Sequence, residues 1–114
     1  MLNNVVLVGR VGKDPEIKFT DAGKAKTTFS LAVDKPFKKQ DGQDNTNWFR
    51  VECWDKTAQS VADHVRKGSV VGVQGRIDIQ KWKDRESGQD KEMTVIVADQ
   101  VRFVGPKPAT NDEP

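Results

Sequence analysis

The chain of 114 residues contains one cysteine, Cys53, and one histidine, His64. A single cysteine excludes an internal disulfide, which fits a reducing compartment. Together these residues are too few for a zinc site built from histidines and cysteines, and no metal or other cofactor is expected. Cys53 alternates with apolar residues and is expected to be buried. His64, beside Asp63 on a predicted helix, is more typical of an exposed residue than of a catalytic base.

Long apolar runs are also missing, since none approaches the ~20 residues of a membrane span. The chain begins Met1-Leu2-Asn3-Asn4, without the charged region of a signal peptide. These absences predict a cytoplasmic protein that has no contact with a membrane.

Neither sign of charge dominates, because the formal net charge is only +2. This balance alone does not indicate nucleic-acid binding, since solvated surfaces carry both signs. The positions of the charges are more informative. Two clusters of basic residues are Lys35, Lys38, Lys39 and Lys81, Lys83, Arg85. The clusters alone are explained equally well by a solvated surface and by phosphate binding.

Alternation of apolar and polar residues with period two dominates the chain and predicts strands. The strands are expected over residues 2–12 (continuing over 16–19), 26–34, 47–54, 69–82 and 91–104. A helix is predicted between the third and fourth of them, where Ala58, Val61, Ala62 and Val65 form an apolar stripe. Asp55 is expected to cap its N-terminus, and Gly68 to follow its C-terminus.

Three strands, a helix and two further strands are the order of an all-β, five-stranded Greek-key OB-fold barrel with the helix between strands 3 and 4. Another small α+β fold is compatible with the same order. The length suits one domain, expected over residues 1–104. Residues 105–114, which begin Gly105-Pro106, are expected to form a short disordered tail.

All three tryptophans are predicted on strand faces that are otherwise polar. The strand over 47–54 has Phe49, Val51 and Cys53 on its core face and Trp48, Arg50, Glu52 and Trp54 on the other. The strand over 69–82 has Val71, Val73, Ile77 and Ile79 on its core face and Gln74, Arg76, Asp78, Gln80 and Trp82 on the other. A fourth aromatic, Phe37, lies in a basic loop.

One tryptophan in a small protein is more often packing than a binding residue, but three on polar faces, with Phe37, favour single-stranded nucleic acid. Unpaired bases stack on flat rings, and nearby cations neutralise phosphates, with no need for a particular sequence. The expected stacking residues are Phe37, Trp48, Trp54 and Trp82. The expected phosphate contacts are Arg10, Lys35, Lys38, Lys39, Arg50, Arg76, Lys81, Lys83 and Arg85.

Five motifs follow one another along the chain: Val8–Glu16 (VGRVGKDPE), Asn47–Val51 (NWFRV), Val65–Ser69 (VRKGS), Gln74–Arg76 (QGR) and Lys81-Trp82. In sequence and order they resemble motifs of the bacterial single-stranded DNA-binding proteins, over about residues 1–104. The resemblance implies a nucleoid-associated OB-fold homotetramer, a dimer of dimers that wraps and protects single-stranded DNA in replication, recombination and repair. It implies stacking roles for Phe37, Trp48, Trp54 and Trp82.

Both faces of the first strand carry large apolar groups, so Val6 and Val8 need an explanation beyond the barrel core. They are covered either by the helix or a loop, or by another subunit through a two-fold contact. The resemblance favours the subunit contact and places this strand in an interface.

The chain departs from the family at its end, Thr110-Asn111-Asp112-Glu113-Pro114, which lacks the family's acidic tip with a final apolar pair. Either the chain is shortened or it belongs to a tail-less branch. Replication and repair proteins remain possible partners, although the tip that recruits them is absent.

Three alternatives stay open: a tail-less OB-fold adaptor, an RNA-binding OB module, and a small enzyme. The last is disfavoured because no acid is paired with a base or nucleophile at motif spacing.

Overall fold

A computed structural model describes residues 1–36 and 45–105, which form six strands and one helix. The elements are β1 (Val5–Val11), β2 (Glu16–Phe19), β3 (Ala25–Asp34), β4 (Thr46–Trp54), α1 (Asp55–His64), β5 (Val70–Lys83) and β6 (Asp90–Phe103). The predicted strands and helix are thus confirmed, and the expected continuation of the first strand is the separate strand β2. Phe37, Lys38, Lys39 and the tail from residue 106 onward lie outside the described residues.

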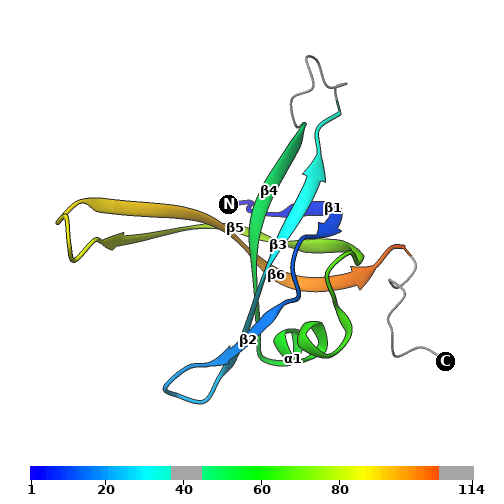
Figure 1. Cartoon of the computed structure of the whole chain (residues 1–114), viewed down its shortest axis with the longest axis horizontal. Coiled ribbons are helices and arrows are strands. Elements are labelled where there is room, and N and C mark those ends of the chain that lie inside the picture. The colour runs from blue at the N-terminus through cyan, green and yellow to red at the C-terminus, as the bar shows by residue number, and fades with distance from the viewer. Residues whose placement is uncertain (37–44, 106–114) are drawn as a thin grey trace.

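The strands form a closed barrel. Their order is β1-β5-β6-β4-β3-β2, and a second pairing of β1 with β3, at Arg10 and Val11, closes the ring. All pairings are antiparallel except that of β4 with β6. This topology, with the helix between β4 and β5 (Figure 1), is the expected OB-fold.

The helix covers one end of the barrel core. Ala58, Val61 and Val65 join the buried side chains of β1, β3, β4, β5 and β6 in a single cluster. A buried hydrogen bond of 2.8 Å from the Thr27 hydroxyl to the Ala58 carbonyl ties α1 to β3. No helix in residues 1–36 and 45–105 is long and apolar enough to cross a membrane.

Both ends of the helix differ from the prediction. Asp55 is the first helical residue, not the cap: Trp54 occupies the N-cap without a side-chain bond, and Asp55 adopts a left-handed φ of 56°. The helix ends at His64, several residues before Gly68. Gly68 instead serves the next turn, where its φ is 90° and its N–H donates to the Val11 carbonyl at 2.8 Å. The chain therefore turns back to the barrel earlier than the sequence suggested.

The outer halves of β5 and β6 leave the barrel as a long two-stranded arm (Figure 1). β1 pairs with β5 only as far as Gly75, next to a bulge, and β6 pairs with β4 only from Val95 onward, so the arm consists of residues 79–83 and 90–94. A side chain at Gly75 would collide with the Val97 carbonyl oxygen. Ile77 and Ile79, predicted as core, are 46% and 52% exposed, because they lie beyond the last pairing of β1 with β5.

Candidate nucleic-acid interface

The strand register places all three tryptophans on the same outer face of the sheet. Directly paired residues point to the same face, and alternate residues of a strand share a face. On β3 and β4, Trp48 pairs with Ala32 and Trp54 with Lys26. Arg50, between the two tryptophans, pairs with Val95 of β6, which has the same parity as Lys91. Lys91 in turn pairs with Trp82 of β5.

Two of the tryptophans are well exposed, Trp48 at 58% and Trp82 at 49%, which is unusual for so large an apolar side chain. Trp54 is only partly buried, and the Lys26 ammonium lies 5.5 Å from the centroid of its ring. This is a cation–π contact. Lys26 therefore belongs to the aromatic face, a role that the sequence did not reveal.

A buried acid lies at the centre of this face. Glu52 has the predicted outward parity but is 1% exposed. The Gln80 amide donates to both of its carboxylate oxygens, at 3.2 and 3.1 Å. The Lys26 ammonium is 3.5 Å and the Arg50 guanidinium 4.0 Å from the same carboxylate. A buried carboxylate needs such partners, and here they join β3, β4 and the root of the arm.

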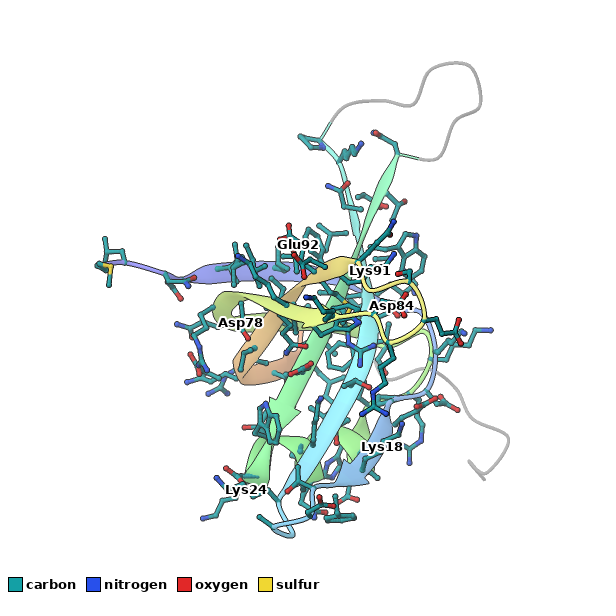
Figure 2. All side chains as sticks on the ribbon, turned by 90° about the vertical axis from the view of Figure 1, so that its left-hand side faces the viewer. Lys18, Lys24, Asp78, Asp84, Lys91 and Glu92 are labelled. Carbon is teal, nitrogen blue, oxygen red and sulfur yellow. The ribbon has the colours of Figure 1, made fainter. Side chains whose placement is uncertain are left out.

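The arm separates cations that are adjacent in sequence. Lys81 and Lys83 lie on the face opposite to Trp82, since neighbouring strand residues alternate. They pair across the arm with Glu92 and Asp90. Lys91, which comes from the returning strand (Figure 2), pairs with Trp82 and therefore lies beside it on the same face. The sequence missed it because the pairing register was unknown.

The remaining predicted cations are distributed around the barrel. Arg10 pairs with Ala32, so it lies in the same row as Trp48, and its guanidinium donates to the Gly68 carbonyl at 3.2 Å. Arg76 is exposed and 3.9 Å from the Asp99 carboxylate. Lys35 and Arg85 are exposed at the ends of β3 and the arm. Arg76 pairs with Val97, which in turn pairs with Glu52, so the structure brings Arg10, Arg50 and Arg76 to the tryptophan face and leaves Lys35 and Arg85 at its margins.

An OB-fold barrel whose outer face carries exposed indoles beside lysine and arginine defines a class of single-stranded nucleic-acid-binding proteins. Comparison with known proteins is more specific. Residues 2–104 match the model of the single-strand binding protein family. The chain belongs to this family.

Relatives and solved structures agree. Single-stranded DNA-binding protein 1 of Nostoc sp. is 42% identical over 106 residues, covering 93% of this chain and 86% of that one. Single-stranded DNA-binding protein B of Bacillus subtilis is 42% identical over 108 residues, or 95% of each chain. A Plasmodium falciparum SSB in complex with single-stranded DNA superposes with a TM-score of 0.80 at 31% identity, over 92% of this chain and 96% of that one.

Proposed function

We propose that this protein binds and protects single-stranded DNA, largely independently of sequence and without catalysis. The observation that carries the proposal is the common outer face of Trp48, Trp54 and Trp82. Each exposed indole offers a surface on which a base stacks, with about 1–3 kcal/mol per base. Phe37, outside the described residues, is a fourth proposed stacking position.

The cations around this face neutralise phosphates. Lys26, Arg50 and Lys91 lie among the tryptophans, and Arg10 lies in the row of Trp48. Release of counterions from the DNA then contributes to affinity and makes it dependent on salt. Neither stacking nor phosphate contact reads base edges, so little sequence preference follows.

Family membership supports a cellular role in replication, recombination and repair, in the cytoplasm and on the nucleoid. The proposed DNA-binding domain spans residues 1–104. Partner proteins of these pathways would act on the DNA that this domain covers.

We also propose a homotetramer, a dimer of dimers with β1 in an interface. Val6, Val8 and Val104 are 65%, 53% and 55% exposed, so neither the helix nor a described loop covers them. Val8 and Val104 meet over Gly72, whose Cβ position is 3.9 and 3.3 Å from their methyl groups. An exposed apolar patch of this kind suits a two-fold contact. Linked barrels would bind long strands more tightly through effective concentration.

Light scattering without DNA tests the assembly. Four chains of 12.7 kDa would give about 51 kDa. A mass that stays near that of one chain at micromolar concentration would contradict the tetramer. Val8→Asp should dissociate it, whereas Asp78→Asn, at the root of the arm, should not.

Titration with oligo-dT tests the function. Tryptophan emission should be quenched strongly, and a duplex of the same length should bind far more weakly because its bases already stack on each other. Equal affinity for the duplex would indicate a general basic surface instead. Competition with oligo-U distinguishes DNA from RNA, since stacking reads neither sugar.

A further inference from the structure

The Trp48 ring lies against Gly12, the residue that follows β1. A Cβ atom built at Gly12 would lie 2.5 Å from Cζ3 and 2.9 Å from Cη2 of Trp48. Both distances are shorter than carbon–carbon contact, which is about 3.5–4.0 Å. The outer edge of the indole therefore occupies the space that any side chain at this position would need.

The backbone does not require glycine here. The described glycines with positive φ are Gly23, Gly68 and Gly88, so Gly12 adopts a conformation open to other residues. Space beside Trp48, and not backbone freedom, is what the missing side chain provides.

The main chain at Gly12 is also held firmly. The Gly12 N–H donates to the Ser30 carbonyl at 3.0 Å, and the Val11 N–H donates to Ser69 at 2.9 Å. Val11 itself is 1% exposed. A side chain at Gly12 would thus move the tryptophan ring, which is 58% exposed, more readily than the barrel.

The neighbouring position is small as well. Gly12 lies two residues after Arg10 on the same face, opposite Ser30, and Trp48 pairs with Ala32, which in turn pairs with Arg10. The residue next to Trp48 in its own row thus also has a small side chain. Gly12 and Ala32 are the two small residues next to the ring, and we call them the seat of Trp48. Arg10 lies in the same row as Ala32 and Trp48.

We propose that Gly12 is a positioning residue for DNA binding: it seats the Trp48 indole so that the exposed part of the ring is presented to a base, beside Arg10. This inference rests on the proposed function, because it concerns how one of the stacking residues is held. Gly12 itself makes no contact with DNA in this scheme.

A double-mutant cycle in the full chain tests it, with oligo-dT as ligand. Trp48→Ala should weaken binding roughly 5- to 150-fold, which corresponds to one stacked base. Gly12→Ala should weaken oligo-dT binding by a large part of the factor expected for Trp48→Ala. In the Trp48→Ala background, adding Gly12→Ala should change affinity less than about 2-fold, since the ring that it displaces is gone.

A smaller ring provides the conservative rescue. In the Trp48→Phe background, Gly12→Ala should cost clearly less than in the wild type, because phenylalanine lacks the fused outer ring. With Trp54 and Trp82 replaced by Phe, the emission of Trp48 alone should be quenched less by oligo-dT when Gly12 is Ala.

The outcomes separate the two claims. If Trp48→Ala weakens oligo-dT binding and Gly12→Ala does not, the positioning role of Gly12 is wrong and the stacking role of Trp48 stands. If Gly12→Ala lowers affinity equally in the wild type and in the Trp48→Ala background, the positioning role of Gly12 is also wrong. No effect of Trp48→Ala overturns both claims. If Gly12→Ala unfolds the protein, folding of the double variant with Trp48→Ala supports the seat, and failure of the double variant overturns it.

Discussion

The Asn3 side chain holds both backbone polar groups of Ile77. Its oxygen accepts the Ile77 N–H at 2.9 Å, and its nitrogen donates to the Ile77 carbonyl at 2.9 Å. Main-chain pairing of β1 with β5 ends at Val5 and Gly75. Asn3 thus continues the pairing by its side chain past the bulge, at the root of the arm that carries Trp82.

Replacing Asn3 by Ala should therefore loosen the arm. Two hydrogen bonds at an exposed site contribute about 1–2 kcal/mol together, so the free energy of unfolding in urea should fall by about this amount. Asn4→Ala is the matched control, because Asn4 is exposed and shows no side-chain hydrogen bond within residues 1–36 and 45–105. Equal unfolding midpoints for the two variants would show that Asn3 does not brace the arm.

The buried Glu52 carboxylate should be costly to remove. Glu52→Ala leaves the Gln80 amide and the Lys26 ammonium without their partner, and unfolding should become about 2–3 kcal/mol easier. Glu52→Gln keeps the volume and one acceptor, and should cost less. Chemical denaturation of both variants measures this, with the exposed Glu86→Ala as control. A Glu52→Ala protein as stable as the control would mean that the carboxylate network contributes nothing.

Lys91 and Lys81 should differ in their effect on DNA binding. Lys91 shares the Trp82 face, whereas Lys81 lies on the opposite face across from Glu92. Lys91→Ala should flatten the log–log dependence of affinity on salt by about 0.7, the value for one phosphate on a single strand. Lys81→Ala should flatten it less. The reverse result would place the DNA on the other face of the arm.

The Cys53 thiol should remain protonated in the folded protein well into the alkaline range. Burial, with a smaller effect of the nearby Glu52 carboxylate, raises its pKa from 9.0 to about 12. Because the unfolded thiol ionises first, its contribution to stability is complete below pH 9 and is lost between about pH 9 and 12, at about 1.4 kcal/mol per pH unit.

The comparison of wild type with Cys53→Ala isolates this contribution, since all other groups titrate in both. The stability difference between the two should shrink as pH rises through this window, and iodoacetamide should label native Cys53 only slowly at pH 8. Rapid labelling without unfolding would contradict its burial.

Side-chain alternation within each strand could be read from the sequence, and pairing between strands could not. Alternation alone assigned Trp48, Trp54 and Trp82 to outward faces, and the exposure of Trp48 and Trp82 confirms this for two of them. The register, which depends on turns far along the chain, decides that Lys91 and not Lys81 lies beside Trp82.

The point along β5 at which the barrel ends could not be predicted from the sequence either. Ile77 and Ile79 continue the core parity of Val71 and Val73, yet they lie beyond the last pairing of β1 with β5. Alternation placed Glu52 on the polar face of its strand and gave no sign of its burial, because that burial depends on Lys26 and Gln80 from two other strands. Such contacts between distant segments leave no local pattern in the sequence.

The central claim is that bases stack on the tryptophan face. The most direct measurement is the affinity of Trp48→Ala and Trp82→Ala for oligo-dT at fixed salt, with folding checked by circular dichroism. Each variant should lose about 1–3 kcal/mol of binding free energy for the base that it no longer stacks. If both variants remain folded and bind oligo-dT like the wild type, the face defined by Trp48 and Trp82 is not where this protein holds DNA.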